Sequence, residues 1–274
     1  MNVCVIGAGS IGRRHLKGMN LLRKSLGIDL ITTYDTNPKR LDIVRSEIEG
    51  VECKESLIDS VKNVDVVFIC VPTSLHIPVY EEISKVGSFH LFFEKPLSHT
   101  IDGCEKMLFE QKQKGKFVAL GYMLHHHPVI MKMREIINQG TLGRVLSVRA
   151  EAGFYLPQWH PWEDYRDFYM SWKVGGGGAL LDLSHEINYL QWIFGDIEEV
   201  QGTMGTVSDL EISSDDLAVA IVKFSNSIVG QIQLDLLQFD ESRFCKVIGT
   251  EGVLIADLHN YANCPRYHVY IPVH

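Results

Sequence analysis

Short apolar runs alternate with amphipathic segments along the first part of the chain. The runs are rich in β-branched and aromatic residues, as buried strands are, and cover residues 3–6, 30–34, 64–71, 90–93 and 116–120. The segments between them, such as 11–26 and 101–113, place apolar residues on one helical face. The run at 64–71 is almost continuously apolar, which is typical of a parallel strand covered on both faces. The alternation predicts six βα steps and a doubly wound parallel sheet over residues 1–121.

The pattern changes after Gly121. One helix is predicted over 128–139, followed by long strand-like runs at 144–154, 197–207, 217–224 and 228–237. A hairpin at Phe224–Ile228 joins the last two runs. From 230 to 236 polar residues alternate with apolar residues or glycine, so one face packs on helices while the other is polar or pairs with another subunit. Residues 122–274 are therefore predicted to form an α+β domain with a largely antiparallel, open sheet.

The first apolar run ends in three glycines, Gly7, Gly9 and Gly12, with the spacing of a dinucleotide-binding turn. Gly7 allows a tight turn, Gly9 lets a pyrophosphate approach the backbone, and Gly12 lets the following helix pack close to the strand. The backbone amides of Ser10 and Ile11 then face the anion at the helix start. The alternative is a flavodoxin-like fold in which the glycines make an ordinary turn.

Asp35 stands at the end of the second apolar run, where a carboxylate can accept a hydrogen bond from a ribose 2′-hydroxyl. A carboxylate repels a 2′-phosphate, so Asp35 favours NAD as the cofactor. Lys39 and Arg40 follow closely and leave NADP as the alternative, with Arg40 as a further cofactor contact.

Two later strands also end in polar residues, and ligands bind outside the carboxyl ends of parallel strands. Pro72, Thr73 and His76 follow one strand, and Glu94 and Lys95 follow the next. All five are predicted to contact the cofactor. Lys95, between a buried strand and a proline, is also placed to polarise a hydroxyl or carbonyl oxygen. The alternatives are a solvated lysine, a Glu94 that pairs with a nearby cation, and a His76 that caps or packs against its helix.

A run of four glycines, Gly175–Gly178, leads into an amphipathic helix that ends at Gly195. Asp182 and His185 are three residues apart and are predicted to share one face of that helix. Because the partial positive charge of a helix N-terminus favours a neutral imidazole, His185 is a candidate general base near neutral pH. The alternative makes Asp182 an N-cap and His185 a buried polar residue.

An irregular segment rich in aromatic residues and proline precedes these glycines, and its makeup is typical of a loop that lines a pocket. Its Trp and Tyr faces suit the C–H face of a sugar, and a planar Arg fork suits a carboxylate or phosphate. The predicted substrate residues are Tyr155, Trp162, Tyr165, Arg166 and, on the following helix, Asn188. The alternative is an aromatic plug between the domains. No metal is predicted, because the consecutive residues His125–His127 cannot readily turn three rings to one ion.

Charge and composition narrow the class of protein. The net charge of −8 argues against a nucleic-acid partner, which requires a concentrated positive surface. No apolar segment is long enough for a membrane helix, and the chain enters a strand at once instead of a signal peptide. The six cysteines contain no Cys-x-x-Cys pair and are predicted to be reduced thiols of a cytoplasmic protein.

Taken together, these motifs resemble the Gfo/Idh/MocA oxidoreductases, the family of glucose–fructose oxidoreductase and inositol 2-dehydrogenase. The likeness covers nearly the whole chain and rests on the glycine turn, Pro72–His76, Glu94–Pro96, Gly143–Val145, and the later glycines followed by Asp182 and His185. The resemblance implies a Rossmann domain, a second domain whose open sheet serves dimers or tetramers, and a bound nicotinamide cofactor. It also implies that Lys95 and His185 lie beside the reacting carbon, with Asp182 assisting. The aromatic segment looks like that of a branch linked to bacterial surface-sugar biosynthesis.

The expected reaction is therefore hydride transfer between NAD(P) and a secondary alcohol or ketone of a sugar or nucleotide-sugar. Three features differ from the family pattern: Asp182 and His185 are one residue closer than is usual, His125 stands where many members carry arginine, and the chain ends earlier than most. The early end favours a rival hypothesis, a cofactor-binding sensor or assembly subunit without turnover. A second rival is a reductase of a non-sugar carbonyl or imine.

Overall fold

The computed structural model describes residues 1–159, 161, 163–258 and 266–271. The chain divides into two compact units, Met1–Gly121 and Tyr122–His274. Among the described residues, no helix has both the length and the apolar character that crossing a bilayer requires. Five cysteines lie in the described part of the chain, and all five are free thiols.

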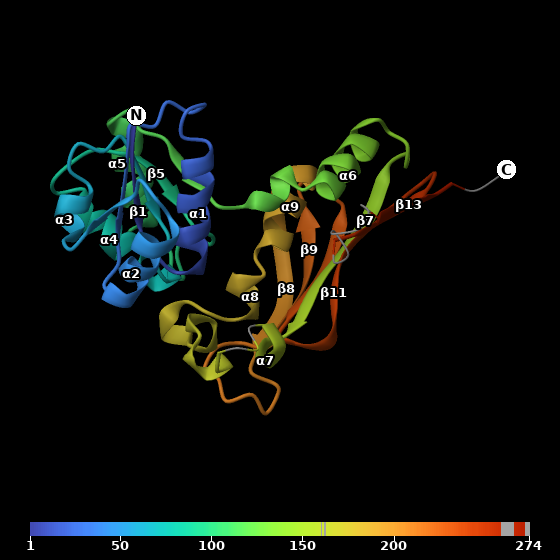
Figure 1. Ribbon diagram of the computed structural model, residues 1–274. Coiled ribbons are helices and arrows are strands. Elements are labelled where there is room, and N and C mark those ends of the chain that lie inside the picture. Colours follow the sequence, from blue (N-terminus) through green and yellow to red (C-terminus); the bar gives the residue numbers. More distant parts are fainter. Residues whose placement is uncertain (160, 162, 259–265, 272–274) are drawn as a thin grey trace. The chain divides into compact units, whose positions relative to one another are not determined.

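The first unit is a six-stranded parallel sheet flanked by helices (Figure 1). Its elements are β1 (Asn2–Ile6), α1 (Ser10–Leu21), β2 (Leu30–Tyr34), α2 (Pro38–Glu47), β3 (Glu52–Lys54), α3 (Leu57–Ser60), β4 (Val66–Ile69), η1 (Thr73–Leu75), α4 (His76–Ile83), β5 (His90–Phe93), α5 (Cys104–Gln113) and β6 (Val118–Leu120). The strand order is β3-β2-β1-β4-β5-β6. The order reverses between β1 and β4, and open α/β sheets bind their ligands at such a point.

The central strand β1 shows why this sheet is apolar throughout. Its Val5 packs with Leu16 of α1, whereas the neighbouring Ile6 packs in a separate core cluster with Ile77 of α4. Successive side chains of a strand point to opposite faces, so a strand covered on both sides has to be apolar at every position. The five predicted strand runs are confirmed. The strand β3 was not predicted, because it has only three residues and none of them is buried, so it forms no apolar run.

The second unit packs helices on a sheet that has seven strands in the described residues (Figure 1). Its helical elements are η2 (Met123–His126), α6 (Pro128–Asn138), α7 (Leu156–Trp159), η3 (Tyr165–Asp167), η4 (Tyr169–Ser171), η5 (Lys173–Gly175), α8 (Ala179–Asp182) and α9 (His185–Phe194). Its strands are β7 (Val145–Tyr155), β8 (Ile197–Gly205), β9 (Leu217–Phe224), β10 (Val229–Asp235), β11 (Leu237–Gly249), β12 (Val253–Asp257) and β13 (Arg266–Tyr270).

The strand order of the second sheet is β13-β12-β11-β7-β10-β9-β8. The β7–β10 pair is parallel and the other pairs are antiparallel, which confirms the largely antiparallel sheet and the β9–β10 hairpin. Ile232 and Leu234 on β10 are buried against the helices, as the alternation predicts. On the other face, Val219 and Ile221 of β9 are 37% and 52% exposed. The sheet is therefore covered on one face and open on the other.

The helix predicted to carry both Asp182 and His185 is two helices in the structure. α8 ends at Asp182 and α9 begins at His185, and Leu183 and Ser184 separate them. The short α8 is held from its start, because the Asp182 carboxylate accepts a hydrogen bond from the Gly178 N–H at 3.1 Å. The expectation that Asp182 and His185 share one helical face is therefore corrected.

Candidate functional site

The glycine turn after β1 forms an open cradle at the start of α1. Gly7 has a φ of +96°, and a Cβ there would lie 2.6 Å from the Cys70 carbonyl oxygen, while a Cβ on Gly12 would overlap the Gly7 carbonyl. A Cβ on Gly9 would meet no atom within 4 Å. Gly9 is also the N-cap of α1, and no side chain caps that helix start, so the first-turn amides near Ser10 and Ile11 can bind an anion. The cradle therefore fits the diphosphate of a dinucleotide.

Replacing glycine by alanine is expected to have a different effect at each of three positions, namely Gly9 at the N-cap of α1 and Gly12 and Gly18 within α1. Gly9→Ala is expected to leave the thermal midpoint unchanged and to weaken NAD binding by at least about 10-fold, because the new methyl occupies space open to the diphosphate. Gly12→Ala is expected to lower the midpoint strongly. Gly18, inside α1 and with open space around it, is the control, and Gly18→Ala is expected to be neutral or stabilising by up to about 1 kcal/mol. Thermal unfolding and equilibrium NAD titration test all three; normal NAD affinity in Gly9→Ala would contradict the cradle.

Asp35 connects the turn that follows β1 with the turn that follows β2. It is 7% exposed. Its carboxylate accepts hydrogen bonds from the Ala8 N–H at 2.7 Å and the Asn37 N–H at 2.8 Å, and the Arg40 guanidinium lies 3.5 Å away. The carboxylate thus stands directly beneath the glycine turn, where a ribose-binding acid is expected.

Asp35→Asn is expected to shift cofactor preference from NAD toward NADP by about 10-fold or more. The substitution removes the charge that repels a 2′-phosphate and releases Arg40 to bind that phosphate. Asp42→Asn is the control, because Asp42 is an exposed acid on the same helix as Arg40 and pairs with Arg45. The ratio of the dissociation constants for NADP and NAD is the measurement. An unchanged ratio would exclude Asp35 from the choice of cofactor.

The predicted cofactor residues that follow β4 lie in or beside the short helix η1. Pro72 caps η1, and Thr73 is buried in it. His76 is 1% exposed, and its two ring nitrogens lie 2.9 Å from the Val71 carbonyl and 3.1 Å from the Leu97 carbonyl. Burial lowers the pKa of His76, so the neutral ring donates to one of these carbonyls. This environment favours the packing alternative for His76, and its contact with a cofactor stays a prediction.

Glu94 has a partner that the sequence did not indicate. Nε2 of His15, on α1, lies 2.6 Å from Oε1 of Glu94. The His15 ring also packs edge-on against Phe92, with centroids 5.2 Å apart. The spacing of one helical turn after Gly12 is the signal that could have shown that His15 returns to the sheet edge. Half-buried Lys95 follows Glu94 directly, and its backbone N–H donates to the Glu94 carboxylate at 3.3 Å.

His185 begins α9 and lies against an aromatic residue from the start of the second unit. Its ring and that of Tyr122 have centroids 5.5 Å apart at 83°. The Tyr122 hydroxyl donates to the Ser184 hydroxyl at 3.4 Å, beside the backbone of His185. Asp182 also accepts from the Tyr169 hydroxyl at 2.7 Å, so its carboxylate holds the glycine segment and the aromatic segment together. Asp182 is not an N-cap, as the alternative proposed: it is the last residue of α8, and the helix N-caps are Gly178 for α8 and Ser184 for α9.

The same side of α9 continues from His185 through Asn188 to Trp192, at spacings of three and four residues. Burial lowers the pKa of His125, although a hydrogen bond with Asn188 acts in the opposite direction. The His125 ring stacks on Trp192 with centroids 4.3 Å apart. The Arg134 guanidinium of α6 lies 4.0 Å from the Trp192 ring centroid. Asn188 therefore belongs to a polar and aromatic row that begins at His185.

The residue after His185 forms a buried ion pair. Glu186 is fully buried, and its two carboxylate oxygens accept hydrogen bonds from Arg243 of β11 at 2.8 and 3.1 Å. Burial alone would lower the pKa of Arg243, but the Glu186 carboxylate holds it above its ordinary value. This bidentate pair anchors the first turn of α9, and no local sequence pattern connects two residues so far apart.

The predicted substrate residues of the aromatic segment have other contacts within the second unit. The Tyr155 ring lies against Phe239, with centroids 4.2 Å apart, and the Tyr165 hydroxyl accepts from the Glu211 N–H at 3.3 Å. Arg166 is half exposed and pairs with Asp164 at 2.6 Å and Glu211 at 2.7 Å. The hydrogen bonds from Arg166 lower the pKa of Asp164 to about 2. The Arg166 fork therefore already holds two carboxylates, and Trp162 lies outside the described residues.

The three consecutive histidines have separate surroundings. His125 stacks on Trp192, His126 is exposed, and His127 caps α6 by accepting from the Val129 N–H at 3.3 Å. In the described part of the chain the ligand atoms that gather within 4.8 Å of one another belong to His15, Cys70 and Glu94. The hydrogen bond between His15 and Glu94 accounts for that approach.

The chain is similar in sequence and in fold to known dehydrogenases. A curated relative is the myo-inositol 2-dehydrogenase of Thermotoga maritima, which is 27% identical over 94% of this chain and 75% of its own length. The WlbA dehydrogenase of Bordetella pertussis, crystallised with NADH and UDP-GlcNAcA, superposes with a TM-score of 0.85 at 20% identity over 100% of this chain and 78% of its own. The UDP-N-acetylglucosamine 3-dehydrogenase GnnA of Acidithiobacillus ferrooxidans gives a TM-score of 0.79 at 20% identity over 99% and 80%.

Two family models match successive parts of the sequence. The model described as an oxidoreductase family with an NAD-binding Rossmann fold covers residues 1–122, and the GFO/IDH/MocA C-terminal domain covers residues 130–255. Together they account for both units and for the glycine cradle. The chain belongs to the Gfo/Idh/MocA family of NAD-binding oxidoreductases.

Proposed function

We propose that this protein oxidises a secondary alcohol of a sugar or nucleotide-sugar with NAD, or reduces the corresponding ketone. The observation that carries the proposal is the position of His185, an imidazole at the first residue of α9 beside Tyr122, in a chain whose other unit has an open dinucleotide cradle. Relatives named as myo-inositol 2-dehydrogenase and UDP-N-acetylglucosamine 3-dehydrogenase support the substrate class.

In the proposed mechanism Asp35 and the amides at the start of α1 bind and orient the dinucleotide, and Pro72, Thr73 and Glu94 extend that contact along the sheet edge. When bound, the nicotinamide supplies the hydride acceptor. His185 removes the proton of the substrate hydroxyl as general base, and the Lys95 ammonium stabilises the negative charge that develops on the oxygen. Asp182 acts as a positioning residue, because it holds the glycine segment that leads to His185.

For the substrate we propose contacts with Asn188, Tyr155 and Tyr165, since an aromatic face and an amide suit a sugar ring and its hydroxyls. Residues 1–121 are proposed to be the cofactor domain and 122–274 the substrate and oligomerisation domain. The exposed apolar residues Val219 and Ile221 of the open sheet support self-association through that face. Dependence on NAD supports a cytoplasmic location.

The test is a hydride-transfer assay with the purified chain, NAD, and a panel of alcohols. The panel pairs myo-inositol and D-xylose with UDP-N-acetylglucosamine and its uronic acid, so that it spans free and nucleotide-linked sugars. NADH absorbance reports turnover, and a separate NAD titration reports binding. Turnover of one panel member supports the proposal. NAD binding without turnover of any of them, in either direction, would favour the cofactor-binding protein without catalysis.

A further inference from the structure

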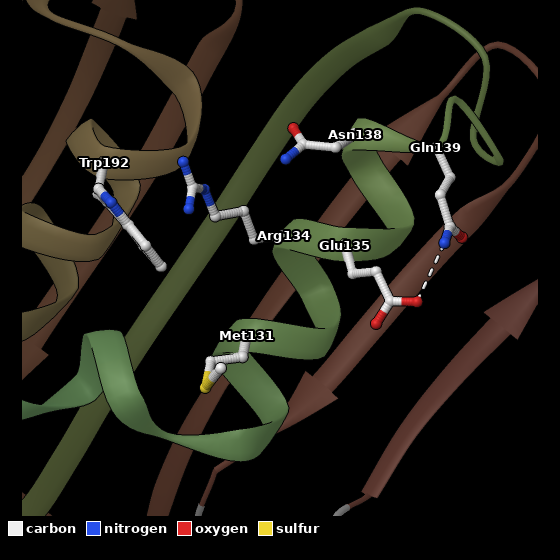
Figure 2. Close-up of a pocket in the computed structure, with 6 residues that line it drawn as sticks. All are labelled: Met131, Arg134, Glu135, Asn138, Gln139 and Trp192. Carbon is white, nitrogen blue, oxygen red and sulfur yellow. Dashed lines mark hydrogen bonds between the residues drawn. The ribbon is translucent and has the colours of Figure 1, made fainter.

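Helices α6 and α9 of the second unit border a cavity of about 380 Å³ that is largely open to solvent (Figure 2). Its lining residues are Met131, Arg134, Glu135, Asn138, Gln139 and Trp192. Arg134 extends from α6 toward Trp192 on α9, and Asn138 lies one turn further along α6 (Figure 2). This volume is at the small end of the range for ligand sites, so it suits one group of a ligand instead of a whole ligand.

Arg134 contributes a cation that has no hydrogen-bond acceptor among the described residues. Its guanidinium lies over Trp192, 4.0 Å from the ring centroid. Asn138 also has no hydrogen-bond partner in that part of the chain. Arg166, in contrast, holds two carboxylates. A guanidinium that is fixed by stacking and keeps its donors is preorganised for a planar oxyanion.

The other charged group that lines the cavity does not neutralise Arg134. Oε1 of Glu135 accepts hydrogen bonds from Lys132 at 2.8 Å and from Gln139 at 3.0 Å, and these contacts hold the pKa of Glu135 below its ordinary value. The carboxylate is therefore ionised and paired with Lys132. The positive charge of Arg134 is left for a ligand.

The cavity continues the row of residues that begins at His185. Trp192 follows His185 by seven residues in α9, which corresponds to about 10 Å along the helix. Between them, Asn188 contacts His125, whose ring stacks on Trp192. Nε2 of His125 is buried and has no hydrogen-bond partner among the described residues. A group bound at Arg134 thus lies well beyond a sugar ring held at His185.

We propose that Arg134, assisted by Asn138, binds an oxyanion of the substrate, a phosphate or a carboxylate, at the end of α6. The inference rests on the proposed function and narrows it, because the substrate then carries a negative charge near Trp192, which lies about 10 Å along α9 from His185. Neutral free sugars lack such a group. Trp192 acts here as the platform for Arg134, and not as a stacking surface for the sugar.

Calorimetric titrations in saturating NADH test the site, since NADH keeps diphosphates out of the glycine cradle. The probes are UDP, UDP-N-acetylglucosamine and D-glucuronate, which separate a diphosphate from a carboxylate. Arg134→Gln is expected to raise the dissociation constant of the oxyanion probe by about 10- to 100-fold, and Arg134→Lys by a smaller factor because it keeps charge without the fork. Arg144→Gln is the control, since Arg144 is exposed in the same unit.

Each outcome bears on one claim. A loss in Arg134→Gln for UDP assigns the site to a diphosphate, and a loss for D-glucuronate assigns it to a carboxylate. Equal effects of Arg134→Gln and Arg144→Gln, or no binding of any probe to the wild type, would overturn the oxyanion site. Turnover of UDP-N-acetylglucosamine with an unchanged KM in Arg134→Gln would leave the proposed function standing without this site. Oxyanion binding at Arg134 without turnover of any substrate would support this site and count against the proposed function.

Discussion

His185→Gln is expected to lower kcat for alcohol oxidation by about 10²- to 10⁴-fold, with little change in the dissociation constant of NAD. Glutamine keeps most of the volume of the side chain but cannot accept the hydroxyl proton at neutral pH. Because His185 starts α9 and packs edge-on against Tyr122, a conservative replacement preserves the helix and isolates the loss of the base. His126→Gln is the control, since His126 is exposed and belongs to the same unit.

Lys95→Met completes the experiment from the other unit. It is expected to reduce kcat by about 10²- to 10³-fold, because the substrate oxygen loses the charge that stabilises it in the transition state. If both residues act on one hydroxyl, their effects are strongly non-additive, and the fold-loss of kcat in the double variant is much smaller than the product of the two single fold-losses. Wild-type kcat in either single variant would remove that residue from the mechanism, and Lys85→Met controls for the loss of a surface charge.

Arg243→Met is expected to destabilise the second unit by about 3–5 kcal/mol, since it leaves the fully buried Glu186 carboxylate without its partner. The double variant Glu186→Leu with Arg243→Met is expected to recover most of that loss, because two apolar side chains need no compensation. All four tryptophans lie beyond Gly121, so tryptophan fluorescence during urea unfolding reports this unit alone.

The exposed pair of Lys223 and Glu199 is the matched control for the buried pair. Lys223→Met is expected to change stability far less than Arg243→Met, because both partners of this pair are solvated. We further expect the double variant at 186 and 243 to lose kcat although its stability returns, because the bidentate contact orients the turn that presents His185. Full kcat in the refolded double variant would show that the pair serves stability alone.

The organisation of the first unit followed from local chemistry. Val3–Ile6 is apolar at every position because both faces of β1 are covered, and the glycines follow at once because the turn and the packing of α1 exclude a Cβ at Gly7 and Gly12. Hydrophobic periodicity did not predict strands that are very short or that follow another strand without a recognisable turn sequence between them. β3 has three residues, and β11 and β12 lie beyond the last predicted run.

The family, the cofactor turn and the candidates Lys95 and His185 could all be predicted from the sequence, because each belongs to a contiguous motif. The surroundings of these residues emerged from the three-dimensional fold. The break between Asp182 and His185, the Glu186–Arg243 pair and the stacking of Arg134 on Trp192 all depend on residues brought together from separate elements. Periodicity reports which face of one element is apolar, whereas partners across elements are chosen by strand order and helix packing, which no single segment encodes.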